Sequence, residues 1–260
     1  MSKKKRNELL DSVTGFFEKQ PRGRVLELGC GEGDYAKRLK DAGFDVLASD
    51  IDKSRFKYDG EIEFTHCDIT KTLPFPDKSF DYVLLLEVVE HLRNPYSVFP
   101  ELNRVLKDGG SLVISTPNIL SLKSRFRYLC EGSYEYFREA PLDQAENPKE
   151  IIFQLHIAPY RYHELEYLLS ATGYTVKDIF TSRYEGHWLS FLLPIIKFQA
   201  RQKDRRVLRN GGMDYRRINK VLLSKEILFG RHLILHAKKE TANALSPRAG
   251  RESQSPVLQM

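Results

Sequence analysis

The sequence contains little cysteine and no long apolar run. Its three cysteines, Cys30, Cys67 and Cys130, lie far apart among 260 residues, which provides neither a disulfide framework nor a closely spaced pair of metal-binding thiols. No stretch of about 18 apolar residues occurs, so we expect no membrane-spanning helix. The N-terminus is basic but no apolar segment follows it, which argues against a secretory signal. These absences predict a cytoplasmic protein in a reducing compartment.

Acidic residues are fewer than basic ones, with 35 Asp and Glu against 41 Lys and Arg, which gives a formal net charge of +6. Much of the excess lies at the N-terminus and within residues 197–209, where Asp204 is the only acid. Apolar residues precede this second cluster, and the combination is typical of a helix on an anionic membrane surface. Two interpretations of residues 187–209 stay open: peripheral contact with the inner membrane surface, or a helix buried under the last strand.

Short apolar segments alternate with helical patterns along the chain. We expect strands at about residues 24–28, 45–49, 62–65, 80–86, 111–116, 174–180 and 228–237. Helices are expected at about residues 7–19, 35–39, 95–106 and 161–171. Several strands are apolar throughout, as in parallel strands that helices cover on both faces. The pattern predicts an α/β fold with a doubly wound, Rossmann-like sheet.

The expected domain organisation follows from where this alternation starts, breaks and ends. It comprises an N-terminal arm and helix over residues 1–22, one α/β domain over 23–239 with two irregular insertions at about 119–160 and 185–224, and a tail over 240–260. The tail has few large apolar residues and is expected to be disordered. The first insertion is rich in aromatic residues and is long enough to cover a binding site as a lid.

Three glycines follow the first expected strand. Gly29, Gly31 and Gly33 stand in the run Glu27-Leu-Gly-Cys-Gly-Glu-Gly, where a strand turns into a helix. Glycines there allow a positive φ and a close approach of a ligand to the backbone, and the helix N-terminus is partially positive. The GxGxG spacing differs from the GxGxxG of dinucleotide-binding folds. A purely structural turn is the alternative interpretation.

Acidic residues end the next two expected strands. Asp50 lies about 20 residues after the first glycine, a spacing that brings a carboxylate beside a bound ribose. Asp52 is the competing candidate, and its alternative role is to cap the next helix. Asp68 follows the third strand, where it can accept a hydrogen bond from the amino group of adenine or serve only a turn. Ile51 and Ile69 are placed to flank the adenine ring.

Five segments in order resemble the class I S-adenosylmethionine-dependent methyltransferases, especially the branch with ubiquinone-type and small-molecule O-methyltransferases. They are VLELGCGEG, ASDID, FTHCDI, LPFPDKSFDYVLLLEVVEHL and ELNRVLKDGGSLVISTPN, and they cover about residues 24–118. The resemblance implies S-adenosylmethionine as the methyl donor, S-adenosylhomocysteine as the product, and a seven-stranded sheet whose last strand is antiparallel. No metal ion is expected.

The resemblance also implies roles for individual residues. Those that would bind the donor are Glu27, Gly29, Cys30, Gly31 and Gly33 at the first loop, Asp50 at the ribose, Ile51, Asp68 and Ile69 at adenine, and Glu87 near the amino group of the methionine part.

Two histidines are candidates for catalysis. A hydroxyl acceptor of high pKa needs a general base, for which histidine is the usual residue. His156 precedes a helix at a place where similar family members carry a histidine beside the acceptor site, and its alternative role is a hydrogen-bonded lid or capping residue. His91 matches a position often occupied in the family, where it is either catalytic or structural. His163 is expected inside the following helix.

The acceptor is not specified by these patterns. The leading hypothesis is methyl transfer to an oxygen of a small-molecule, glycan or lipid-linked acceptor. A second hypothesis is methylation of nucleic acid or protein, against which the chain shows neither an RNA-binding appendage nor an Asn-Pro-Pro-Tyr motif. A third is a cofactor-binding module without catalysis. The sequence contains no signal for an oligomeric state.

Overall fold

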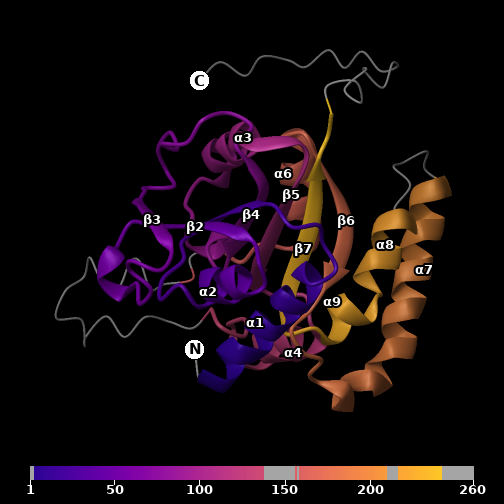
Figure 1. The fold of residues 1–260 in the computed structure, drawn as a ribbon. Coiled ribbons are helices and arrows are strands. Elements are labelled where there is room, and N and C mark those ends of the chain that lie inside the picture. The colour runs from indigo at the N-terminus through magenta and orange to yellow at the C-terminus, as the bar shows by residue number, and fades with distance from the viewer. Residues whose placement is uncertain (1–2, 138–155, 157, 210–215, 242–260) are drawn as a thin grey trace, which may run out of the picture.

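The computed structural model describes residues 3–137, 156, 158–209 and 216–241. Through this part of the chain runs a seven-stranded sheet with the strand order β3-β2-β1-β4-β5-β7-β6 (Figure 1). The strands are β1 (Arg24–Leu28), β2 (Asp45–Asp50), β3 (Glu63–His66), β4 (Phe80–Leu86), β5 (Leu106–Pro117), β6 (Tyr174–Phe180) and β7 (His232–Lys239).

Helices and 3-10 turns connect the strands. They are α1 (Lys3–Phe17), α2 (Asp34–Asp41), η1 (Lys53–Arg55), η2 (Val89–His91), α3 (Pro95–Val105), α4 (Leu122–Glu131), α6 (Tyr162–Ala171), η4 (His187–Leu192), α7 (Leu193–Arg209), α8 (Arg216–Leu222) and α9 (Lys225–Phe229).

The pairing of the strands confirms the predicted topology. Strands β3, β2, β1, β4 and β5 are parallel to one another, whereas β7 is antiparallel to both β5 and β6. The strand order reverses direction between β1 and β4, because the chain builds outward to β3 before it returns to β4. In doubly wound sheets ligands bind beside the carboxyl ends of the strands at such a switch point.

Two apolar cores lie on opposite faces of the sheet, because successive side chains of a strand point to opposite sides. On one face Leu26 and Leu85 pack in a cluster with residues of α3 and α6. On the other face Val25 and Leu84 pack with residues of α1 and α2. The sheet is therefore covered on both sides, which explains why its central strands are apolar throughout.

The last strand begins later than predicted. The sequence suggested a continuous strand over residues 228–237, but residues 225–229 form helix α9 and the strand starts at His232. Ser224 caps this helix, since its side chain accepts a hydrogen bond from the N–H of Ile227. Buried Asn118 donates hydrogen bonds to the carbonyls of Ile227 and Gly230. A short apolar run is buried in either conformation, so hydrophobicity alone could not separate helix from strand here.

Both predicted insertions contain regular structure. The first includes α4, and residues 138–155 and 157 of it lie outside the described residues. The second was expected to be irregular but contains η4, α7 and α8, and in Figure 1 α7 stands beside α8 at the side of the molecule away from β3. Most of the predicted tail, residues 242–260, lies outside the described residues. In the described part of the chain no helix combines the length and apolarity needed to span a bilayer.

Candidate functional site

The turn between β1 and α2 contains the three predicted glycines, and all three have positive φ values of 71°, 53° and 83°. A side chain at Gly29 would place its Cβ 2.6 Å from Val88, and one at Gly33 would lie 2.5 Å from the ring of Phe56. These two glycines are therefore required by protein packing as well as by backbone conformation. Gly31 differs, because a Cβ there would meet no atom within 4 Å. The loop consequently has one glycine that faces open space.

Asp50, at the end of β2, is bonded to this loop. Its Oδ2 accepts a hydrogen bond from the N–H of Gly31 at 2.8 Å, and its Oδ1 accepts one from the N–H of Asp52 at 3.0 Å. An ionised carboxylate has about four acceptor positions, so further hydrogen bonds remain available to each oxygen. The structure thus brings together the glycine turn and the acid that the sequence assigned to a ribose.

Asp52, the competing candidate for the ribose, caps helix η1. Its Oδ1 accepts a hydrogen bond from the N–H of Ser54 at 2.8 Å, and its Oδ2 accepts one from the hydroxyl of Ser54 at 2.9 Å. These bonds are those of an N-terminal cap, which was the alternative role of this residue. Ile51 lies between the two acids and is 46% exposed, which leaves it free to contact a ligand.

The segment after β3 lies beside the end of β2, because the N–H of Cys67 donates to the carbonyl of Asp50 at 3.0 Å. The Oδ1 of Asp68 accepts hydrogen bonds from the hydroxyl and the N–H of Thr70 at 2.7 and 3.0 Å. These bonds lower the pKa of Asp68 and keep it ionised. Ile69 is partly buried against the core. The turn thus uses one carboxylate oxygen of Asp68. A role for Asp68 or Ile69 at adenine stays a prediction.

Glu27 and Cys30 are buried residues at the glycine turn. Glu27 is on β1 and Cys30 is in the turn itself, and both are at most 5% exposed. Burial raises the pKa of the Cys30 thiol, and the negative charges of Glu27 and Asp50 raise it further. A thiol that stays protonated is a poor nucleophile. Cys30 therefore fits a packing role in the loop, while Glu27 places a carboxylate under it.

Glu87 ends β4 in a left-handed backbone conformation with φ 54°. The N–H of Glu87 donates to the carbonyl and to the hydroxyl oxygen of Ser115 at 3.1 and 3.0 Å, and the Ser115 hydroxyl donates to Glu87 Oε1 at 2.8 Å. Its other carboxylate oxygen lies 3.7 Å from Nε2 of His232. Burial raises the pKa of Glu87 to about 7, although Ser115 and Arg231 oppose this shift. Such strain in a non-glycine residue is typical of functional sites.

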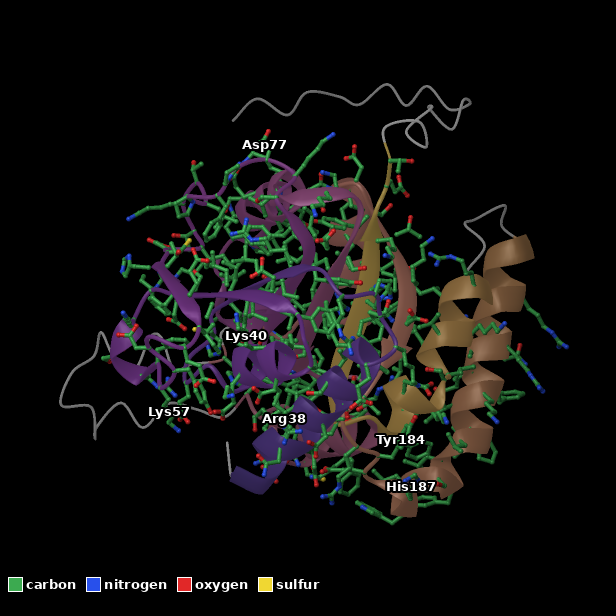
Figure 2. All side chains as sticks on the ribbon, in the orientation of Figure 1. Arg38, Lys40, Lys57, Asp77, Tyr184 and His187 are labelled. Carbon is green, nitrogen blue, oxygen red and sulfur yellow. The ribbon has the colours of Figure 1, made fainter. Side chains whose placement is uncertain are left out.

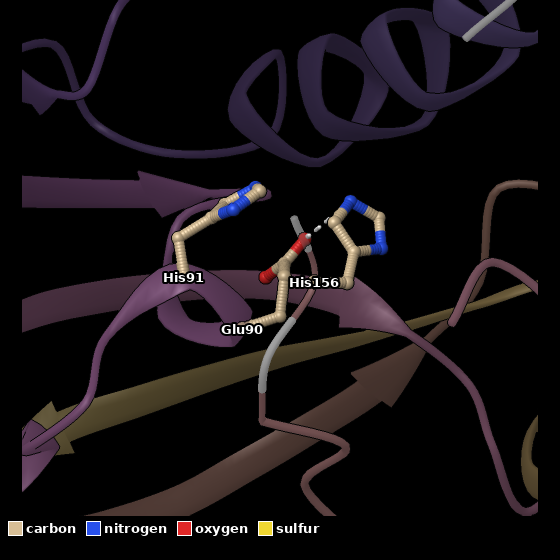
Figure 3. Close-up of side chains that lie close together, drawn as sticks. All are labelled: Glu90, His91 and His156. Atoms are coloured by element: carbon tan, nitrogen blue, oxygen red, sulfur yellow. Dashed lines mark ion pairs between the residues drawn. The ribbon is translucent and has the colours of Figure 1, made fainter. Parts of the chain in front are cut away.

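Three further side chains converge just after Glu87. Figure 3 shows Glu90 and His91, from η2, beside His156. One ligand atom of each residue lies within 4.8 Å of one from each of the others, and Glu90 Oε1 is 4.0 Å from His156 Nε2. The two imidazole rings meet edge to face with centroids 4.9 Å apart. The structure therefore joins the two histidines that the sequence analysis had considered separately.

The environment of His156 affects its suitability as a general base. Burial lowers the pKa of His156 to about 4, and the neighbouring His91 contributes. An imidazole with this pKa is neutral at pH 7 and has a lone pair, but it is a weak base. The catalytic roles of His156 and His91 stay predictions, and His163 lies in α6 as expected.

Glu90 has no role that the sequence predicts. The side chain is fully buried, and neither carboxylate oxygen has a hydrogen-bond partner. Burial raises the pKa of Glu90 well above its usual value, and the charge of Glu87 adds to the shift. The signal was present in the run Glu87-Val-Val-Glu90-His91, which places two acids and a histidine directly after a buried strand. Its meaning depends on His156, which is 65 positions further along the chain.

Comparison with protein families gives a match over the central part of the sheet. Residues 26–114 match a model described as a methyltransferase domain. A probable S-adenosylmethionine-dependent methyltransferase of Mycolicibacterium smegmatis is 31% identical over 159 residues, which are 59% of this chain and 52% of the relative. A demethylmenaquinone methyltransferase of Clavibacter sepedonicus is 37% identical over 106 residues, or 37% of this chain and 43% of the relative. The chain spans about half the length of these curated relatives.

Solved structures share the fold. The crystal structure of a SAM-dependent methyltransferase from Archaeoglobus fulgidus aligns with a TM-score of 0.54 and 21% identity, covering 88% of this chain and 94% of that one. At this identity the similarity concerns the arrangement of strands and helices, and it agrees with the sheet order described above.

Proposed function

Because this chain belongs to the class I S-adenosylmethionine-dependent methyltransferases, we propose that it transfers a methyl group from S-adenosylmethionine to an oxygen of a small-molecule, glycan or lipid-linked acceptor. The observation that carries the proposal is the hydrogen bond between Asp50 and Gly31 at the carboxyl edge of the sheet. This bond joins a loop that faces open space to a carboxylate that can accept hydrogen bonds from the ribose hydroxyls.

The residues present fit the donor. The open space beside Gly31 lets the backbone approach a ligand closely. Three carboxylates lie at this edge, on Glu27, Asp50 and Glu87, and their negative potential favours a ligand that carries a sulfonium and an ammonium group. Asp50 holds the sugar, while the left-handed turn at Glu87 directs its backbone toward the glycine loop, where Val88 contacts Gly29.

In the reaction the protein must align the acceptor, exclude water and accept the proton of the acceptor hydroxyl. S-adenosylmethionine supplies a methyl group that is already electrophilic, so alignment of the acceptor and exclusion of water account for much of the rate. The acceptor oxygen gains the methyl carbon and gives up its proton, while the donor leaves as S-adenosylhomocysteine. In this proposal neutral His156 receives the hydroxyl proton directly or through a water molecule.

Labelled methyl transfer tests this function. The protein is incubated with fractions of a cell extract and S-adenosylmethionine labelled at the methyl group, and the product is identified by mass spectrometry. We expect label in a small or lipid-soluble product. Label in nucleic acid or protein would favour the second hypothesis. Donor binding without any transfer across all fractions would favour a binding module and contradict the enzymatic proposal.

An exposed apolar surface supports a lipid-linked acceptor such as a quinone. Trp188 and Phe191 of η4 and Ile195 and Phe198 of α7 are each at least 57% exposed. The ring of Trp188 meets that of Phe126 on α4 edge to face at 5.3 Å, which joins α4 to this surface. The interpretation of a fully buried helix does not fit these exposures. On the opposite side of α7, Leu193 and Ile196 pack inward.

Positive charges flank this apolar surface. Lys197, Arg201 and Arg205 are exposed and recur every four residues along α7, so they form a stripe next to Ile195 and Phe198. Apolar side chains beside basic ones are what an interfacial helix requires, because the former insert and the latter attract anionic headgroups. We therefore propose that η4 and α7 dock on an anionic membrane surface. Figure 2 shows side chains of α7 projecting away from the sheet.

Sedimentation with vesicles tests the membrane contact. The protein should pellet with vesicles that contain anionic lipid, and less of it should pellet at high salt. The double variant Trp188→Ala/Phe191→Ala should bind the vesicles with an affinity about tenfold lower than that of the wild type. Tyr167→Ala is the matched control, since Tyr167 is an exposed aromatic on α6. Absence of pelleting at low salt would contradict the proposal. A concentration-dependent dimer that the double variant abolishes would also contradict it, because a second copy of the chain would then cover the apolar surface.

A further inference from the structure

We propose that Glu90, His91 and His156 form a binding site for a divalent transition-metal ion. One ligand atom from each residue lies within 4.8 Å of the others, and the side chains come from η2 and from the segment before α6 (Figure 3). Two imidazoles and one carboxylate are a common ligand set for such ions, with coordination positions left open. The sequence predicts no metal ion when the cysteine spacing and each histidine are considered separately.

The state of Glu90 is the first argument. Its side chain is 0% exposed and both carboxylate oxygens lack a hydrogen-bond partner. A buried polar group without a partner is destabilising, and a buried charge more so, unless it is paired or coordinates a metal ion. The Thr116 hydroxyl lies near this carboxylate but forms no hydrogen bond of normal geometry with it, and His156 Nε2 is 4.0 Å from Oε1, beyond hydrogen-bond distance. A cation between these two atoms would satisfy the carboxylate.

The geometry is close to that of a coordination shell. Zinc lies about 2.0–2.2 Å from imidazole nitrogen and carboxylate oxygen, so neighbouring ligand atoms of a tetrahedral site are about 3.4 Å apart. The 4.0 Å between Glu90 and His156 and the bound of 4.8 Å for the whole cluster both exceed this value, so the side chains must rotate toward an ion when it binds. The two imidazole rings lie edge to face with centroids 4.9 Å apart, an arrangement that is compatible with one nitrogen of each at a separate corner of a coordination shell.

The backbone holds the third ligand in place. The N–H of Ala158 donates to the carbonyl of Glu90 at 3.0 Å, and the Tyr160 hydroxyl donates to the carbonyl of Leu92 at 3.4 Å. These bonds fasten the segment that carries His156 to the turn that carries the other two ligands. These tertiary hydrogen bonds keep the two segments that carry the three side chains next to each other in the absence of an ion.

The place of the cluster suggests what an ion would do. Val88, within the same turn, contacts Gly29 of the glycine loop, so the cluster lies close to the proposed methyl donor. A divalent ion with open positions lowers the pKa of a bound hydroxyl and orients it. This role in preparing the acceptor oxygen rests on the proposed methyl transfer. The binding of the ion does not, and it can be measured without donor or acceptor.

Calorimetric titration of chelator-treated protein with ZnCl2, and separately with MnCl2, tests the site. We expect one ion per chain, and at least a 100-fold loss of affinity in Glu90→Gln, His91→Gln and His156→Gln. His163→Gln is the matched control, because it removes a nearby imidazole that lies in α6 outside the cluster. The control should bind one ion with wild-type affinity.

Stability separates loss of a ligand from loss of the fold. Glu90→Gln removes a buried carboxyl without a partner, so the metal-free variant should melt at the wild-type temperature or above it. Added ZnCl2 should raise the melting temperature of the wild type and not that of this variant. The proposal is overturned if the wild type binds neither ion, or if Glu90→Gln and the wild type bind equally. Metal binding without methyl transfer would leave the site intact and contradict only the proposed function.

Discussion

The carboxylate of Asp50, at the end of β2, accepts a hydrogen bond from the backbone N–H of Gly31, in the turn after β1, at 2.8 Å. This contact links the ends of β1 and β2 before any ligand binds. Preorganisation of this kind reduces the entropy lost on binding, because the carboxylate is already oriented.

The first prediction concerns Asp50. Asp50→Ala removes the acceptor of ribose hydroxyls and the bond to Gly31, so S-adenosylmethionine affinity should fall about 10- to 100-fold, the range for hydrogen bonds to a charged group. Calorimetric titration with the donor measures this. Asp52→Ala is the control, because Asp52 caps η1 and should lose stability with little change in donor affinity. Equal losses in both variants would reject the assignment of the ribose to Asp50.

The second prediction separates backbone strain from ligand contact. Gly31 and Gly60 have φ values of 53° and 80°, and a Cβ would meet no atom within 4 Å at either position. Alanine at each should therefore lower the free energy of unfolding by about 1 kcal/mol. Only Gly31→Ala should also weaken donor binding, because its methyl group occupies the space we assign to the ligand. Denaturant titration and calorimetry on the two variants give the comparison, and unchanged donor affinity in Gly31→Ala would contradict the placement.

The third prediction concerns His156. His156→Gln should leave donor affinity unchanged and lower turnover at least 100-fold, whether the imidazole accepts a proton or binds an ion. Turnover with labelled donor is measured once an acceptor is known. The metal titration then distinguishes the two roles, since only an ion ligand affects both turnover and zinc affinity. Wild-type turnover would remove His156 from either role.

The fourth prediction is a dependence of stability on pH. Burial lowers the pKa of His236 below its ordinary 6.5, although Asp178, 2.6 Å away, opposes the shift. Lys177 and Lys238 act in the same direction as burial. The unfolded chain binds a proton at this residue at about pH 6.5, whereas the folded chain binds it only at a lower pH, so stability falls as the pH drops through 6.5.

Denaturant titrations at pH 5 and pH 8 measure this contribution. His236→Gln should lose less stability than the wild type between pH 8 and pH 5, because the variant has no group to protonate at this position. Other titrating groups are common to both proteins and cancel in the difference. Asp178→Asn removes the opposing charge and should lose more stability than the wild type. A difference of zero for His236→Gln would refute the assignment.

The sequence was sufficient for the sheet and for the glycine turn and acid at its carboxyl edge, because these features follow from local patterns. Apolar strands, turn glycines and acids at strand ends each act within a few residues, and Gly31 and Asp50 meet as their positions predict. The start of the last strand was wrong by four residues, since the apolar run after Ser224 fits helix or strand and the cap of α9 decided it.

The cluster of Glu90, His91 and His156 could not be predicted in the same way. Its two segments are 65 positions apart, and they are joined by the hydrogen bond from Ala158 to Glu90. No periodicity in the sequence specifies such a contact. The exposed side of α7 was ambiguous for a similar reason, since an apolar stripe does not indicate whether another element covers it.

The central claim is that S-adenosylmethionine binds between Gly31 and Asp50 at the carboxyl edge of the sheet. A crystal structure of the protein with S-adenosylhomocysteine tests it most directly. We predict electron density for the ribose hydroxyls within hydrogen-bond distance of Asp50 and for the amino acid part beside the glycine loop. A well-ordered glycine loop with no density there, or the compound bound at another place, would contradict the account.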